Sequence, residues 1–361
     1  MIKKFSKIII KITIISLAIF SFITLKTVEA APKKANIIIV ATGGTIDGIA
    51  KSSSNSAYSP SQLMVAELIK NIPDLEKIAN ITSLQFSQIN SQDMNNDLWL
   101  KLAKTINRLA AKRAIDGIVI THGTDTMEET AYFLNLVVKS KKPIILVGSM
   151  RPANSLSSDG SLNLYNAVAL AANPAAKNKG VMIVFNDNIF AARDATKTNT
   201  TNVDSFQSNN SGAIGHIYYG QAQFYYNPIR LNTINSVFDV RDLETLPKVD
   251  IIYGYANHSK IVIDDLVNDG AQGLVLAGVG DGNIYQDSLQ SLINASAKGI
   301  AVVRSSRVGS GFVAPNVEID DDKYKFITAD NLNPQKARIL LMLALTKTTN
   351  PKKIQQYFWQ Y

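Results

Sequence analysis

The chain has 361 residues, of which 46% are hydrophobic, and a formal net charge of +8. This length and apolar content allow one large or two ordinary domains with a buried core, so disorder is excluded as the default state. The chain has no cysteine. That excludes disulfide bonds, thiolate zinc sites, a cysteine nucleophile and a lipid anchor on cysteine.

Residues 1–30 have the order of regions expected of a secretory signal peptide. Three lysines precede an apolar stretch from Ile8 to Leu25, and small residues follow at Ala30 and Ala31. The alternative is a retained membrane anchor, since the stretch is about as long as a spanning helix. Lys11 interrupts the stretch, however, and the two alanines suit cleavage. We therefore expect cleavage after Ala30, a periplasmic or secreted protein, and no membrane contact once the signal is removed.

The positive charge of the chain is partly a property of this signal. Residues 1–30 hold five lysines and one glutamate, so their removal lowers the net charge from +8 to +4. The remaining surplus is spread thinly, without a basic run that would bind phosphates. We therefore expect no nucleic-acid partner.

The first part of the mature chain has the pattern of an α/β domain. Short apolar runs end in glycine-rich or polar loops at Asn36–Ala41, Gly117–Ile120, Pro143–Val147 and Gly180–Phe185. Segments with helical period lie between them at Ser61–Ile72 and Met127–Val138. Apolar runs without polar alternation, separated by helices, indicate a parallel sheet covered on both faces. The sequence predicts a larger N-terminal parallel-sheet domain over residues 31–225.

A second, smaller α/β domain is predicted over residues 249–361. Residues 226–248 show neither period and hold Pro228 and Pro247, which favours an inter-domain linker. Apolar runs resume at Asp250–Tyr253, Gly273–Ala277 and Gly299–Arg304. The last predicted helix is Pro334–Leu345, with Asn333 placed to cap it and proline at its first position.

Two loops that follow predicted strands have the same character. Thr42–Thr45 (Thr-Gly-Gly-Thr) follows the first run, and Thr121–Thr126 (Thr-His-Gly-Thr-Asp-Thr) follows the second. Ligands of open parallel sheets bind at the carboxyl ends of strands, so these loops are the first candidates for a site. Thr126 and Glu129 have capping-box spacing. A Gly-Gly-Thr turn alone is weak evidence, because many such turns merely connect a strand to a helix. The glycine-rich loop Thr42–Thr45 matches neither the phosphate-loop motif nor the dinucleotide-binding motif.

Four segments taken together give a specific resemblance. They are 41–46 (Ala-Thr-Gly-Gly-Thr-Ile), 91–94 (Ser-Gln-Asp-Met), 121–130 (Thr-His-Gly-Thr-Asp-Thr-Met-Glu-Glu-Thr) and 194–200 (Asp-Ala-Thr-Lys-Thr-Asn-Thr). In order and spacing the chain resembles the bacterial type II, exported L-asparaginases, of the asparaginase/glutaminase family with a threonine nucleophile. The resemblance implies hydrolysis of L-asparagine to L-aspartate and ammonia through a β-aspartyl-threonine acyl-enzyme. An enzyme that prefers L-glutamine or takes both amides is the nearest alternative, since the substrates differ by one methylene.

The resemblance also implies catalytic roles. Thr45 is expected to be the nucleophile and Tyr58, on a closing loop, the side chain over it. Thr124, Asp125 and Lys197 form the second expected group. There, Lys197 either draws a proton from Thr124 or, with Asp125, polarises the water used in deacylation. Without the resemblance, each residue has an ordinary alternative role. Tyr58 could lie in an ordinary loop, Asp125 could cap a helix, and Lys197 could be a solvated surface residue.

Further residues are expected to hold the substrate. The resemblance assigns substrate binding to Ser91, Gln92, Thr124, Asp125, Asn283 and Glu318. It assigns the oxyanion hole to backbone amides near Gly44 and Thr124. Asn283 and Glu318 would come from a neighbouring subunit, which implies a homotetramer with shared sites.

Several alternatives remain open at this stage. Ser91 could merely cap a helix over Asn96–Ile106, and Glu318 lies in an acidic run that suits solvated surface. Asp281 stands where many relatives carry asparagine, and its effect on ammonium binding is left open. An exported solute-binding protein is a rival from another class.

No metal and no cofactor are expected. The chain has three histidines, His122, His216 and His258, and they lie far apart without ligand spacing. His122 is expected to be structural within its loop.

Overall fold

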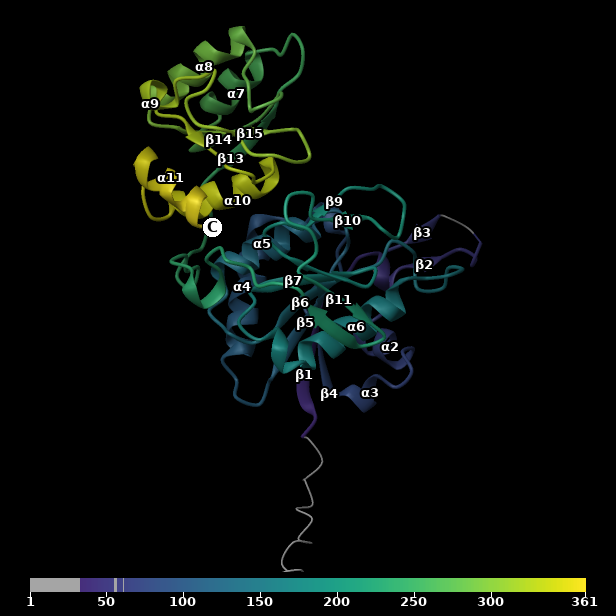
Figure 1. Ribbon diagram of the computed structural model, residues 1–361. Helices are drawn as coiled ribbons and strands as arrows, with labels where there is room; N and C mark the ends of the chain where they lie inside the picture. Colours follow the sequence, from purple (N-terminus) through teal and green to yellow (C-terminus); the bar gives the residue numbers. More distant parts are fainter. Residues whose placement is uncertain (1–32, 55–56, 61) are drawn as a thin grey trace, which may run out of the picture. The chain divides into compact units, whose positions relative to one another are not determined.

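The computed structural model describes residues 33–54, 57–60 and 62–361. The predicted signal peptide therefore lies outside the described residues. Ala35–Tyr361 forms one compact unit, shown in Figure 1. Its strands form a larger sheet in the N-terminal part and a smaller sheet in the C-terminal part, which confirms the predicted α/β organisation. No helix within the described ranges is long and apolar enough to span a bilayer.

The larger sheet is mostly parallel. Within the described residues its strands lie in the order β12 (Gln221–Phe224), β11 (Gly215–Tyr218), β8 (Asn188–Ala191), β7 (Val181–Phe185), β6 (Ile144–Val147), β5 (Gly117–Thr121), β1 (Ala35–Ala41) and β4 (Ala79–Gln85). Pairing is parallel from β4 through β7. The strands β8, β11 and β12 extend the sheet with antiparallel pairing, which was not predicted.

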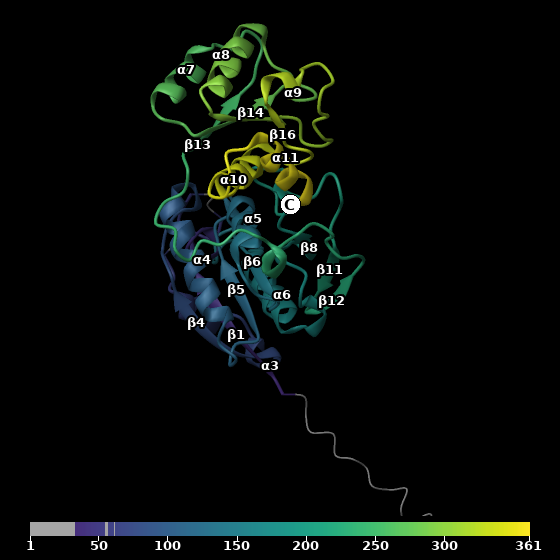
Figure 2. The ribbon, with the colours of Figure 1, turned by 90° about the vertical axis from the view of Figure 1, so that its left-hand side faces the viewer.

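Helices cover both faces of the larger sheet, as Figures 1 and 2 show. One face packs against α4 (Asn96–Ala110) and α5 (Met127–Val137), and the other against α2 (Val65–Lys70), α3 (Leu75–Ile78) and α6 (Gly160–Ala172). Successive strand residues point to opposite faces, so Ile38 and Val40 join the first core while Ile37 and Ile39 join the second. The central strands carry continuous apolar runs because both faces of the larger sheet are buried.

The smaller sheet is parallel throughout. Its strands lie in the order β13 (Val249–Tyr253), β14 (Gly273–Gly278), β15 (Ala301–Ser306) and β16 (Ile327–Thr328). The helices of this part are α7 (Ile261–Asn268), α8 (Gln286–Ala297), α9 (Asp321–Tyr324), α10 (Pro334–Leu345) and α11 (Pro351–Gln360). The bounds predicted for α10 and its Asn333 cap are confirmed, since the Lys336 amide donates to Asn333 Oδ1 at 3.0 Å. The expectation that this helix is the last one is wrong, because α11 follows it.

Several very short elements connect these layers. They are β2 (Ile49–Ala50), β3 (Tyr58–Ser59), β9 (Thr196–Lys197), β10 (Phe206–Gln207) and the 3-10 helices η1 (Thr45–Asp47), η2 (Ser91–Asp93), η3 (Pro174–Ala176) and η4 (Thr233–Asn235). Candidate site residues lie on η1, β3, η2 and β9. Their positions are therefore set by tertiary contacts, because elements of two or three residues cannot stabilise themselves.

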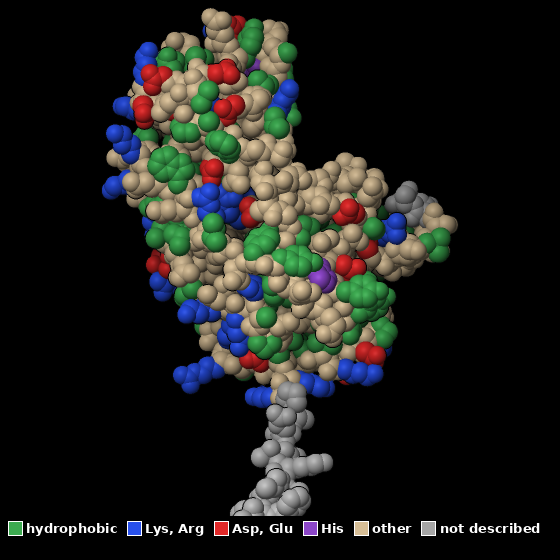
Figure 3. Space-filling model, viewed as in Figure 1, with side chains coloured by type: hydrophobic (Ala, Val, Ile, Leu, Met, Phe, Trp, Pro, Cys, Tyr) green, Lys and Arg blue, Asp and Glu red, His purple; other side chains and the backbone are tan. Residues whose placement is uncertain are grey.

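The charged side chains on the face drawn in Figure 3 are interspersed. Lysine and arginine side chains lie among aspartate and glutamate side chains, and no single patch of one sign covers that face. This distribution agrees with the thin spread of charge along the sequence.

Candidate active site

The two threonine-containing loops meet backbone to backbone. They follow β1 and β5, which are parallel neighbours, so both loops emerge at the same edge of the sheet. A Cβ atom on Gly44 would lie 2.4 Å from the Cα of Gly123, and Gly44 has a φ of 111°. Glycine is required there both by the close approach and by the positive φ. The Thr42 hydroxyl joins the loops further by donating to Thr121 O at 2.9 Å.

Thr45 lies at the start of η1, with Tyr58 over it. The hydroxyl oxygens of the two residues are 2.8 Å apart, and either can donate. Thr45 is 8% exposed, whereas Tyr58 is 39% exposed. Tyr58 reaches this position on β3, which pairs with β2 in a small hairpin. The structure therefore brings together Thr45 and Tyr58, the threonine expected to be the nucleophile and the tyrosine expected over it.

Lys197 reaches the second threonine from β9. Its ammonium donates to Thr124 Oγ1 at 2.9 Å and to Asp125 Oδ1 at 2.6 Å. The Lys197 side chain is 18% exposed and that of Asp125 is 56% exposed. The three residues form one hydrogen-bonded group, so the solvated-lysine alternative does not hold.

Ser91 is held against the loop after β5. Its hydroxyl accepts from the Asp125 amide at 3.2 Å, and its carbonyl accepts from the Thr126 hydroxyl at 2.6 Å. The predicted capping box of Thr126 is therefore wrong, because its side chain turns to Ser91. Asn95, rather than Ser91, caps α4 by accepting from the Leu98 amide at 3.0 Å.

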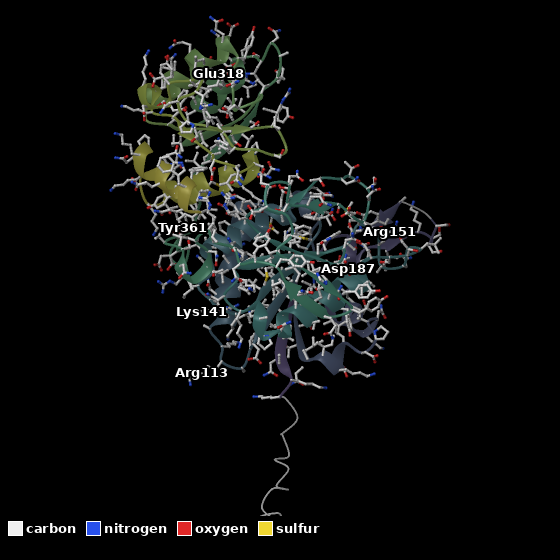
Figure 4. All side chains as sticks on the ribbon, in the orientation of Figure 1. Arg113, Lys141, Arg151, Asp187, Glu318 and Tyr361 are labelled. Atoms are coloured by element: carbon white, nitrogen blue, oxygen red, sulfur yellow. The ribbon has the colours of Figure 1, made fainter. Side chains whose placement is uncertain are left out.

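These groups line one pocket with a volume of about 620 Å³. The predicted residues on its wall are Gly44, Thr45, Tyr58, Ser91, Gln92, Thr124, Asp125 and Lys197. Asn283 and Glu318 are not on this wall. Glu318 is exposed, and Figure 4 shows it well away from Arg151, which lines the pocket.

The sequence reasoning missed a part of the wall formed by Met150, Arg151, Pro152, Ser155 and Leu156. These residues follow β6, a strand that the apolar pattern had predicted. The rule that ligands bind at strand carboxyl ends could have found them. Arg151 adds a cationic side chain to the pocket; its guanidinium donates to Ser157 O at 2.8 Å.

The side chain of His122, within the second loop, is buried and hydrogen-bonded at both ring nitrogens. Trp99 Nε1 lies 2.9 Å from Thr130 Oγ1, which lies 2.9 Å from His122 Nε2. Because the Gly123 carbonyl can only accept, His122 Nδ1 carries the hydrogen; in the neutral ring Nε2 is then an acceptor, so the Thr130 hydroxyl donates to it while accepting from the indole. Burial lowers the pKa of His122 to about 4, so the ring is neutral near pH 7.

Glu129, in the first turn of α5, gives the fold a testable pH dependence. Burial, and then the neighbouring Glu128, raise the pKa of its carboxyl from 4.5 to about 7. The folded state thus binds this proton more tightly than the unfolded state, so stability falls as pH rises from about 4.5 to about 7. Glu129→Gln should remove this decrease in stability. Its free energy of unfolding should exceed that of the parent by up to about 3 kcal/mol at pH 8, and by much less at pH 5. Urea unfolding at both pH values measures this; an equal difference at both would contradict the shift.

The histidines and acidic residues of the described chain do not gather around the pocket in a metal-binding arrangement. Over residues 33–54, 57–60 and 62–361, no three His, Cys, Asp or Glu side chains form a group that could hold an ion. The pocket wall presents hydroxyl, ammonium, carboxylate and amide groups.

Comparison with known proteins covers nearly the whole of this compact unit. The family model described as "Asparaginase, N-terminal" matches residues 36–230, and "Glutaminase/Asparaginase C-terminal domain" matches residues 248–358. The chain is 52% identical over 323 residues to a Haemophilus influenzae protein named "Probable L-asparaginase periplasmic", with 90% of this chain and 92% of the relative covered. It is 45% identical over 338 residues to "Glutaminase-asparaginase" of Pseudomonas fluorescens biotype A, with 93% of each covered.

A solved structure is similar over the same range. It is the crystal structure of a probable cytoplasmic L-asparaginase from Campylobacter jejuni, with a TM-score of 0.88 and 50% identity. The match covers 91% of this chain and 100% of that one. Both parts of the fold and the order of the motifs thus agree with one family: the chain belongs to the asparaginases.

Proposed function

We propose that this chain hydrolyses L-asparagine to L-aspartate and ammonia. The observation that carries the proposal is a single pocket with two threonine hydroxyls, each hydrogen-bonded to a side chain that can move a proton. Thr45 is paired with Tyr58, and Thr124 with Lys197. Relatives named as L-asparaginase and glutaminase-asparaginase support the same class of substrate.

In the first step, Thr45 Oγ1 attacks the side-chain amide carbon of asparagine. A threonine hydroxyl needs an adjacent base, and the Tyr58 hydroxyl at 2.8 Å is placed to accept the Thr45 proton while it passes its own proton toward the amide nitrogen. Backbone amides near Gly44 and Thr124 stabilise the negative oxygen of the tetrahedral intermediate. Its collapse breaks the carbon–nitrogen bond; the amide nitrogen takes up the proton and leaves as ammonia, while a β-aspartyl ester stays on Thr45.

In the second step, water hydrolyses this ester. Water attacks the ester carbonyl, its proton returns to Thr45 Oγ1, and aspartate is released. The sequence left two roles open for Lys197. Its ammonium donates at once to Thr124 and to Asp125, which supports the role of holding and polarising the water rather than drawing a proton from Thr124.

The remaining residues are proposed to recognise the amino acid itself. The Asp125 carboxylate and Gln92 meet the ammonium, and Ser91 with the backbone around it meets the α-carboxylate. Glu318 and Asn283 complete the site from a neighbouring subunit, in a homotetramer with shared sites. Neither residue lines the pocket of its own chain, and Figure 4 shows Glu318 well away from Arg151 of the pocket wall, which supports this.

We propose that the Asp281 side chain stabilises the surrounding backbone and does not contact the substrate. Its Oδ1 accepts from the Ala314 amide at 2.8 Å, which ties the turn that bears Asn283 to the segment that bears Glu318. Asparagine at this position could accept the same hydrogen bond, so the exchange leaves the tie intact.

Export after cleavage at Ala30 is also proposed. The relative named as periplasmic supports it, whereas the similar solved structure is described as cytoplasmic. A mass measurement of the chain recovered from outside the cytoplasm tests both points. An intact amino terminus there would contradict cleavage.

Ammonia release by the purified mature chain tests the proposed reaction. We expect turnover of asparagine, and we expect kcat/KM for asparagine and for glutamine to differ by about tenfold, because one methylene is worth ~1–3 kcal/mol in such a pocket. Coupled detection of ammonia with each amide measures the ratio. Stoichiometric binding of asparagine without turnover would overturn the proposal and favour a solute-binding protein.

A further inference from the structure

We propose that Glu128 is a positioning residue that holds Lys197 against Thr124 and Asp125. The inference rests on the proposed function, in which Lys197 serves the reaction. Glu128 is the second residue of α5 and is 3% exposed, so its carboxylate is buried beneath the pocket wall. Burying a carboxylate costs free energy unless hydrogen bonds compensate, so the partners of Glu128 must stabilise its charge.

One carboxylate oxygen of Glu128 binds the backbone of Lys197. The Lys197 amide donates to Glu128 Oε2 at 2.8 Å. The other end of Lys197 is held by Thr124 and Asp125, which lie four and three residues before Glu128 on the same loop and helix. Lys197 is thus attached at both ends to one rigid element. This matters because β9 has two residues and pairs with β10 alone among the described strands.

The other oxygen of Glu128 binds the start of α10. Glu128 Oε1 accepts from Asn333 Nδ2 at 3.0 Å and from Gln335 Nε2 at 2.8 Å. Asn333 Nδ2 also donates to Thr196 Oγ1 at 3.1 Å, on the residue before Lys197. The helices α5 and α10 pack together, as both ribbon views show. Glu128 therefore joins α5, β9 and α10 at one point.

The geometry requires a carboxylate at this point. Three N–H donors converge on Glu128, and a carboxylate offers acceptors only. A glutamine would turn an N–H group toward one of these donors. Asn333 cannot simply reverse its amide, because its Oδ1 caps α10 by accepting from Lys336. The conflict is relieved most easily at β9, the shortest of the three elements, and its movement displaces Lys197.

Glu128→Gln tests the inference, with Glu129→Gln as the matched control. Glu129 is the adjacent glutamate of the same helix, and the pocket wall does not include it. We expect Glu128→Gln to lower kcat for asparagine by about tenfold to a hundredfold, as displacement of a catalytic group by about 1 Å does. Because Lys197 serves deacylation in the proposed reaction, KM should fall together with kcat, and kcat/KM, which reports acylation, should change less than about threefold. Glu129→Gln should stay within about twofold of the parent in both constants.

A double-mutant cycle separates positioning from general damage. If Glu128 acts through Lys197, Glu128→Gln should add little to the loss caused by Lys197→Met. Full additivity of the two losses would overturn the proposal. Gln335→Ala, which removes one donor to Glu128 from α10, is the second variant should Glu128→Gln fold poorly. It should lower kcat in the same direction and by less.

A readout without turnover distinguishes this inference from the proposed function. Reductive methylation of lysines, followed by peptide mass analysis, reports how freely the Lys197 ammonium reacts. Because that ammonium is held by Thr124 and Asp125, its reaction should be slow in the parent and in Glu129→Gln, and several-fold faster in Glu128→Gln. Unchanged Lys197 reactivity in Glu128→Gln would overturn the positioning role, whether or not the parent releases ammonia.

Discussion

Replacing Thr45 with valine should lower ammonia release from asparagine by about a thousandfold or more, because removal of the proposed nucleophile abolishes the proposed covalent route. Valine keeps the branched shape of threonine and removes its hydroxyl. Thr45 is 8% exposed, and a valine side chain of the same shape should fit the space that it occupies. Steady-state ammonia release and the unfolding midpoint together measure the effect.

Thr45→Ser is the matched control for this prediction. Serine keeps the hydroxyl that lies 2.8 Å from the Tyr58 hydroxyl, so it should retain measurable turnover. Acid quenching of the parent during turnover should give a peptide containing Thr45 with the added mass of one aspartyl group. A valine variant as active as the parent, or the acyl group on another side chain, would remove the nucleophile assignment.

Asp321→Ala should lower the free energy of unfolding by about 3–5 kcal/mol, because it leaves a buried guanidinium without its carboxylate. Arg304 is 1% exposed, and its Nε and Nη2 each donate to Asp321 at 2.6 Å. Asp322→Ala is the matched control. Its carboxylate is exposed and accepts from Asn316 Nδ2 at 3.0 Å, so it should change stability by less than about 1 kcal/mol. Urea unfolding measures both variants.

The same buried pair supports the residues proposed to serve a neighbouring subunit. Arg304 also donates to Asp281 O at 3.1 Å and to Ala314 O at 3.0 Å. These carbonyls lie in the segments that carry Asn283 and Glu318. We therefore expect Asp321→Ala to lose activity at urea concentrations below those at which it unfolds. Full activity in a destabilised Asp321→Ala protein would contradict this support, and equal stability of the two alanine variants would contradict the charge-burial argument.

The main helices and central strands could be predicted from sequence because their signals are local. Runs such as the one forming β1 are continuously apolar since both faces are buried, and α10 begins where Asn333 and Pro334 predict. The strands that were missed carry weaker signals. β4 is an edge strand with exposed polar residues, and β12 alternates exposed with half-buried residues. In α11, Asn350 and Pro351 repeat the capping signal, but just Ile354 and Phe358 of its described residues are buried within it.

The sequence by itself determined which chemical groups this protein has and the loops on which most of them lie. Threonine beside glycine at the ends of neighbouring parallel strands specifies a site, because strand order and polarity bring those ends together. Tertiary structure alone decided the pairings. Lys197 meets Thr124 across 73 positions of sequence, and Glu128 meets Gln335 across 207. No local pattern encodes such contacts, since they depend on how a two-residue strand and the start of a helix pack against α5.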